Sequence, residues 1–209
     1  MAGFGENGGI PEYLADGVER VVFSSETPGV WLENTSGWTA EMTDWGNPHD
    51  QERIRARQAA TGWRWLSGRA ATEGPLVAGC LEVLDWLRGT EWWPPLDGAV
   101  LALETSEEAP PPIAVARFLR SLAASGELAH INALLFARPG GADLAVERHA
   151  DYDAAILAVV RDEEGRTDLP VVTGLDFGHT DPMWTLPIGA AVHVDPGERE
   201  IAFVTAAVT

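Results

Sequence analysis

The chain has 209 residues, of which 45% are hydrophobic, and a formal net charge of −18 at pH 7; all 14 basic residues are arginines. This length is sufficient for one large domain or two small ones. Because such an acidic surface repels the phosphate backbones of nucleic acids, we expect no nucleic-acid binding. No apolar run reaches the roughly 20 residues that span a membrane, and the first residues do not resemble a signal peptide, which predicts a cytoplasmic protein without membrane contact.

Residues 1–70 are expected to contain much irregular structure. A proline near the start and apolar residues at helical spacing predict a helix over residues 11–23, with Leu14, Val18 and Val21 on one face. The other predicted elements of this part are a glycine-rich linker over 1–9, an irregular segment over 24–48, a short polar helix over 50–60 and a strand over 63–70.

Strands and helices alternate in the rest of the chain. The predicted strands cover 75–77, 99–103, 131–137 and 169–172, and the predicted helices cover 80–87, 113–124 and 152–160. A turn at 195–198 joins two further strands, over 191–194 and 201–205, into a C-terminal β-hairpin. The alternation predicts a single α/β domain, and the hairpin predicts a mixed sheet rather than a purely parallel one.

Two side chains with useful chemistry follow predicted strands. Glu104 comes directly after the apolar run 99–103, and His179 lies on a glycine-flanked turn after the strand at 169–172. Folds of the α/β class place functional groups at the carboxyl ends of strands, where side chains from different strands can converge. A carboxylate that orients a histidine is part of a nucleophilic triad, so Glu104 and His179 are candidate catalytic residues.

The sequence offers this pair no evident nucleophile. Ser106 is too close to Glu104 along the chain to be presented independently, and Thr180 adjoins the histidine and would point elsewhere. The Gly-x-Ser-x-Gly elbow of other hydrolases does not occur.

Metal binding is a competing use of the histidine. His179, Asp176 and Asp181 could act as ligands, but the recurrent His-Glu-x-x-His spacing is missing, and Asp176 is more simply a turn residue that bonds backbone amides. The single cysteine, Cys80, excludes an internal disulfide and a cysteine-cluster metal site, and its apolar neighbours predict a small buried side chain. We therefore expect no metal and no cofactor.

The nine tryptophans are many for a chain of this length. Trp31, Trp38 and Trp45 lie in the segment expected to be irregular. Core packing is the ordinary role of a tryptophan, but loops lie on the surface, where exposed aromatic rings often stack on ligands. The loop tryptophans are therefore candidates for ligand binding.

Six segments in a fixed order resemble the LD-carboxypeptidase family of serine peptidases. They are GFGENGG at 3–9, WTAEMTDW at 38–45, GCLEVLDWLRGT at 79–90, LALETSEE at 101–108, DFGHT at 176–180 and PIG at 187–189. The match covers nearly the whole chain and is most similar to the microcin-immunity branch of the family. Many family members have an asparagine at the position of Cys80, whereas a cysteine is typical of that branch.

The resemblance implies both the fold and the roles of residues. In this family a C-terminal domain of the swivelling β/β/α type supplies the glutamate and the histidine of a Ser-Glu-His triad, and an N-terminal domain supplies the serine and the oxyanion-hole amides. The resemblance implies that Glu104 is the triad acid and His179 the general base. It further implies that residues 1–9 are the remnant of an interdomain linker and that residues 10–209 are the C-terminal domain.

The same resemblance implies a partner and a substrate class. The N-terminal nucleophile domain is missing from the chain, through truncation or because it is separately encoded, so we expect no activity from the chain alone. The substrate would be a cell-wall peptide or an aminoacyl-nucleotide, whose base would stack on Trp38 or Trp45. The uncovered domain face predicts a homodimer. The alternative is a non-catalytic module that binds a nucleotide or a sugar through its loop tryptophans.

Overall fold

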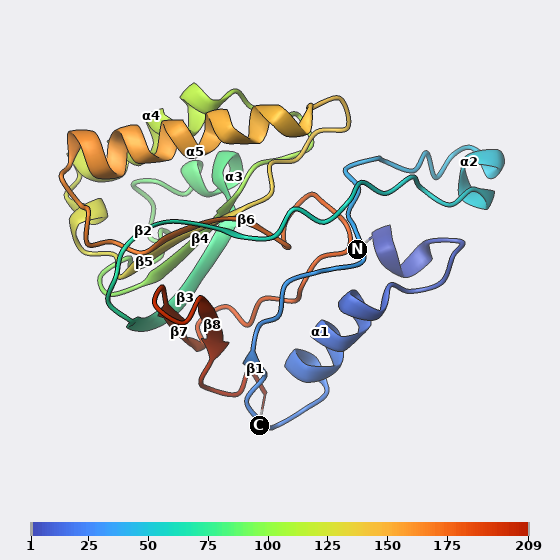
Figure 1. Ribbon diagram of the computed structural model, residues 1–209, viewed down its shortest axis with the longest axis horizontal. Helices are drawn as coiled ribbons and strands as arrows, with labels where there is room; N and C mark the ends of the chain where they lie inside the picture. Colours follow the sequence, from blue (N-terminus) through green and yellow to red (C-terminus); the bar gives the residue numbers. More distant parts are fainter. Residues whose placement is uncertain (1, 209) are drawn as a thin grey trace.

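The computed structural model describes residues 2–208, which form one curled, mixed eight-stranded sheet with helices (Figure 1). The strands are β1 (Gly29–Val30), β2 (Arg64–Ser67), β3 (Thr72–Cys80), β4 (Val100–Glu104), β5 (Ala133–Ala137), β6 (Val171–Leu175), β7 (Ala191–Asp195) and β8 (Glu200–Phe203). Their order across the sheet is β1-β8-β7-β3-β4-β5-β6-β2. Parallel pairing joins β3 to β4, β4 to β5 and β5 to β6, and the other neighbours are antiparallel. The predicted mixed α/β fold and C-terminal hairpin are confirmed.

The helices lie in two groups. The α-helices are α1 (Glu12–Val22), α2 (Pro48–Glu52), α3 (Leu81–Asp85), α4 (Pro112–Ala124) and α5 (His149–Leu157). Three 3₁₀ turns are η1 (Ala2–Gly5), η2 (Glu127–Ala129) and η3 (Val146–Arg148), and a π-helix, η4 (Ala158–Glu163), continues α5. Helices α3, α4 and α5 lie over the parallel strands, whereas α1 lies away from them, beside β1 (Figure 1). None of the described helices is both long and apolar enough to cross a bilayer.

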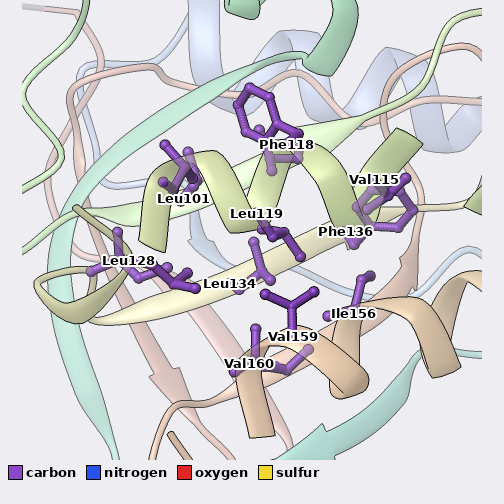
Figure 2. Close-up of a cluster of buried hydrophobic side chains, with 14 of the residues drawn as sticks. Leu101, Val115, Phe118, Leu119, Leu128, Leu134, Phe136, Ile156, Val159 and Val160 are labelled. Carbon is purple, nitrogen blue, oxygen red and sulfur yellow. The ribbon is translucent and has the colours of Figure 1, made fainter. Parts of the chain in front are cut away.

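A hydrophobic core fills each face of the sheet. Under the helices, Leu119 of α4 and Val159 of η4 meet over Leu134 of β5, and all three side chains are fully buried (Figure 2). On the other face the curl of the sheet encloses a second core that includes Trp31 and Phe203. Because both of its faces are covered, β5 is buried at every position, as expected of a central parallel strand.

Strand β3 is longer than the sequence predicted. The predicted strand 75–77 is the middle of β3, which continues to Cys80, and the predicted helix 80–87 is only the short α3. Residues 72–75 pair antiparallel with β7, and residues 76–80 pair in parallel with β4. The backbone amides and carbonyls of residues 78–80 therefore have strand partners, which outweigh the helical spacing of the apolar residues.

The predicted helix over residues 50–60 is wrong. Helix α2 ends at Glu52, residues 53–57 form neither helix nor strand, and Gln58 bridges to Trp38. The arginines of this segment separate because they pair with different acids: Arg53 with Glu41 and Asp50, and Arg55 with Asp181. The pairs of Arg53 with Glu41 and of Arg55 with Asp181 join residues that are not at helical spacing, so the sequence pattern does not predict them.

The N-terminal segment, predicted to be a linker, is held against the rest of the chain. Residues Ala2–Gly5 of this segment form η1. The side chain of Glu6 is buried, and its Oε2 lies 3.3 Å from Nη2 of Arg55. The Nη1 of Arg55 donates to Oδ2 of Asp181 at 2.7 Å. Arg55 thus joins the N-terminal segment to the turn that carries His179.

Candidate active site

The sheet places Cys80, Glu104 and His179 close together at one edge. Strands β3 and β4 are parallel, and Cys80 is the register partner of Glu104. His179 follows β6, which is separated from β4 by β5, so its turn crosses the end of β5 to reach Glu104. The convergence predicted for Glu104 and His179 follows from this parallel arrangement.

Gly178 allows the turn to approach Glu104. Its φ of 86° lies in the left-handed region, which L-residues with a side chain rarely adopt. A Cβ at this position would lie 2.7 Å from both Cβ and Oε2 of Glu104. Glycine before His179 is therefore required by the backbone conformation and by the contact with the carboxylate.

Asp176 fixes the start of the same turn. Its carboxylate accepts hydrogen bonds from Nη1 of Arg138 at 2.9 Å, from Nε1 of Trp63 at 2.8 Å and from the backbone amide of Asn34 at 3.2 Å. Its carbonyl oxygen accepts from the amide of Trp184 at 2.7 Å. Because these contacts occupy its carboxylate oxygens, Asp176 acts as an anchor of the turn and not as a metal ligand beside His179.

Glu104 and His179 are paired in an arrangement suited to a general base. Nδ1 of the imidazole lies 2.7 Å from Oε2 of Glu104, and the glutamate is buried. Burial raises the pKa of the Glu104 carboxyl, and the hydrogen bond and charge of His179 oppose that rise. The other imidazole nitrogen, Nε2, faces the half-exposed Glu107 at 3.2 Å. A carboxylate on Nδ1 leaves Nε2 as the nitrogen that can exchange a proton with a substrate or a nucleophile.

Cys80 is the residue of this group that was not predicted to lie beside Glu104 and His179. Its side chain was expected to be a small buried hydrophobe, but it is only partly buried and lies beside Glu104. Burial and the nearby Glu104 charge raise the pKa of the thiol to about 12, so the thiol stays protonated and is a poor nucleophile near neutral pH. The sequence predicted this strand to stop at residue 77, so Cys80 was not expected at a strand end, whereas β3 continues to Cys80.

Ser106 and Thr180, which follow Glu104 and His179 in the sequence, each carry a hydroxyl group. Ser106 Oγ donates to Oε1 of Glu82 at 2.6 Å. Thr180 is buried, with 1% of its surface exposed. Within the described residues, neither hydroxyl forms a hydrogen bond with His179.

An apolar groove of about 560 Å³ adjoins the pair. One wall is α1, with Leu14 and Val18, and the other includes Ala78, Leu186 and Ile188. Cys80 and Glu104 also line it, so the groove brings an apolar surface next to the carboxylate. Such a groove with a few polar groups is a typical binding surface for a small molecule or another protein segment.

The two candidate stacking residues lie in different environments. Trp38 is 1% exposed, and its ring contacts the Arg138 guanidinium, 4.7 Å from the ring centroid, and the imidazole of His149. Trp45 is 51% exposed and packs beside Gly5. The structure therefore leaves Trp45 with an accessible ring, whereas the Trp38 ring is part of the packed interior.

Comparison with known proteins identifies similar sequences over most of the chain. The family model described as the LD-carboxypeptidase C-terminal domain matches residues 73–194. The microcin C7 self-immunity protein MccF of Escherichia coli is 26% identical over 167 residues, which cover 79% of this chain and 45% of that protein. The chain spans about half the length of the curated relatives that it matches first.

Solved structures show the same fold. An MccF-like protein from Streptococcus pneumoniae, in complex with AMP, has a TM-score of 0.75 and 28% sequence identity to this chain. The matched region covers 93% of this chain and 58% of the Streptococcus pneumoniae chain. An MccF-like protein from Bacillus anthracis has a TM-score of 0.69 at 21% sequence identity, and the matched region covers 84% of this chain and 51% of the Bacillus anthracis chain. The curled mixed sheet and its helices are thus shared with both.

Proposed function

Because the chain belongs to the family of LD-carboxypeptidase C-terminal domains, we propose that it supplies the general base and the orienting acid of a serine amidase. The observation that carries this proposal is the 2.7 Å contact between Nδ1 of His179 and Oε2 of Glu104. The serine would come from an N-terminal nucleophile domain that is not among these residues. In this scheme residues 10–209 are the C-terminal domain, and residues 1–9 lead into it.

The proposed reaction uses both nitrogens of the His179 imidazole. The partner's serine attacks the amide carbonyl, and Nε2 of His179 accepts the serine proton. Glu104 holds the ring orientation through Nδ1 and stabilises the imidazolium that forms. His179 then protonates the leaving amine, and a water molecule, activated in the same way, releases the acyl group from the serine.

The proposed substrate is an amide next to a carboxylate, either in a cell-wall peptide or in an aminoacyl-nucleotide. The AMP bound by the Streptococcus pneumoniae protein supports the nucleotide as one class. Trp45, with its exposed ring, is our candidate for stacking on the base. Stacking on Trp38 would require its buried ring to leave the interior.

A fusion protein tests the proposed reaction. The nucleophile domain of the Streptococcus pneumoniae protein is joined to residues 1–209, and hydrolysis of an aminoacyl sulfamoyl adenosine and of a muropeptide is followed by chromatography. We expect turnover by the fusion and none by the chain alone, since loss of a triad serine costs on the order of 10⁶ in kcat. His179→Gln in the fusion should lower kcat by at least about 10³-fold.

The matched control is His130→Gln. His130 is an exposed histidine that lies 3.6 Å from Asp97, and its loss should leave kcat unchanged. Hydrolysis by the chain alone would refute the need for a partner. Full activity of the His179→Gln fusion would refute the role of the imidazole.

A further inference from the structure

Cys80, Glu104 and His179 form a mixed set of potential metal ligands. One donor atom from each side chain, the thiol sulfur, a carboxylate oxygen and an imidazole nitrogen, lies within 4.8 Å of the other two. In a tetrahedral zinc site with bonds of 2.0–2.3 Å, donor atoms are roughly 3.5 Å apart. To bind an ion, the three donor atoms must therefore move closer together by on the order of 1 Å. Side-chain rotations can achieve this without moving the backbone of the strands that hold Cys80 and Glu104.

The electrostatic surroundings favour a cation. Glu82 lies 3.4 Å from the Cys80 sulfur, and Glu107 lies 3.2 Å from Nε2 of His179. Within residues 2–208, no arginine forms an ion pair with Glu82, Glu104 or Glu107. Three carboxylates that have no arginine partner thus lie close to the thiol or the imidazole, in a chain that is strongly acidic as a whole.

The site is also accessible to an ion from solvent. The His179 side chain is 37% exposed. Cys80 and Glu104 line the groove beside α1. An ion can therefore reach all three donors without unfolding of the sheet.

We propose that Cys80, Glu104 and His179 bind a thiophilic divalent cation such as Zn²⁺. The donors match the sulfur, nitrogen and oxygen ligands that Zn²⁺ prefers, and three protein ligands leave a fourth position for water. On binding, the S–H bond of Cys80 breaks, its proton passes to solvent, and the thiolate bonds to the ion. While bound, the ion holds Glu104 and His179, so it would inhibit the reaction proposed above; that consequence alone rests on the proposed function.

Cobalt binding by the purified chain tests this site. Co²⁺ is titrated into the chain under reducing conditions, and the near-ultraviolet absorption is recorded for thiolate-to-cobalt charge transfer. Because Cys80 is the single cysteine, such a band reports this site alone. We expect one equivalent of Co²⁺ to produce the band and one equivalent of Zn²⁺ to remove it.

Three variants distinguish this site from surface binding. Cys80→Ser should abolish the band, and His179→Gln should weaken Co²⁺ binding by more than about tenfold. His130→Gln, which removes the exposed histidine near Asp97, should bind like the parent chain. Near-ultraviolet circular dichroism of the tryptophans verifies that each variant is folded.

Two results would overturn the proposal. One is the absence of a charge-transfer band with the parent chain, and the other is unchanged Co²⁺ affinity in a folded His179→Gln variant. The titration requires no hydrolysis, so its failure leaves the proposed amidase reaction untouched, and an inactive fusion protein leaves the metal site untouched.

Discussion

At the scale of single residues, the imidazole of His179 lies between two carboxylates. Glu104 is buried and contacts Nδ1, whereas Glu107 is 48% exposed at its side chain and contacts Nε2. A serine that approached Nε2 would have to displace Glu107. An exposed ion pair of this kind is worth about 1 kcal/mol or less, so the displacement costs little compared with the Glu104 contact.

The buried His149 predicts a loss of stability in mild acid. Burial and the charges of Arg64 and Arg138 lower the pKa of His149 from 6.5 to about 4. Between these values the unfolded chain binds a proton that the folded chain does not, so the free energy of unfolding falls as the pH drops from about 6.5 to about 4 and levels off below. At about 1.4 kcal/mol per pH unit, this one group contributes roughly 3 kcal/mol.

Urea unfolding across that pH range measures the effect. Other groups titrate in the same range, so the informative quantity is the difference between the parent chain and His149→Gln. The free energy of unfolding of His149→Gln should change less with pH than that of the parent chain. The control His130→Gln, at an exposed histidine, should show the same pH dependence as the parent. Equal slopes for the parent chain and His149→Gln would show that His149 is not buried in its neutral form.

At the scale of elements, the strands and turns that could be predicted from the sequence are those marked by neighbouring residues, such as an apolar run or a glycine. The apolar run before Glu104 and the turn after β6 were evident, and the parallel sheet brought their ends together. The place of Cys80 was missed because the extent of β3 depends on pairing with β4 and β7. Whether the notable loop tryptophans are exposed also depends on distant residues, since Arg138 and His149 cover Trp38.

The bridge at Arg55 predicts a strong coupling between elements. Its side chain is 3% exposed and pairs with Glu6 and Asp181, which are also buried. Arg55→Met would leave both carboxylates without this partner, and breaking a buried ion pair costs about 3–5 kcal/mol. We expect the free energy of unfolding to fall by that amount, measured by urea denaturation, and residues 2–9 to become sensitive to proteolysis.

Arg57→Met is the matched control. Arg57 contacts the same Glu6 at 3.5 Å, but its side chain is 29% exposed. Its removal should cost less than about 1 kcal/mol. If both variants lost equal stability, the N-terminal segment would not be held through Arg55.

At the scale of the whole molecule, the groove beside α1 has an exposed apolar rim. Phe23 is 80% exposed and Ile188 is 68% exposed, and both line the groove. Exposed apolar area of this kind favours association, and in the proposed assembly the nucleophile domain would cover it. In the absence of that domain, we expect the chain to form dimers.

Light scattering over a range of concentrations tests this expectation. The average mass should rise with concentration for the parent chain, and the double variant with Phe23→Ser and Ile188→Ser should remain monomeric. Trp86→Ser removes a ring that is 76% exposed but does not line the groove, so this variant should associate like the parent. A parent chain that stays monomeric at high concentration would show that this rim does not join two copies.

The pairing of β1 with β8 has a consequence for synthesis on the ribosome. Gly29 and Val30 are translated about 170 residues before their register partners, Phe203 and Ala202. Strand β8 in turn links β1 to β7, and β7 links it to β3. Strand β1 therefore has no native partner until β8 has been translated, and the curl of the sheet cannot close before that point.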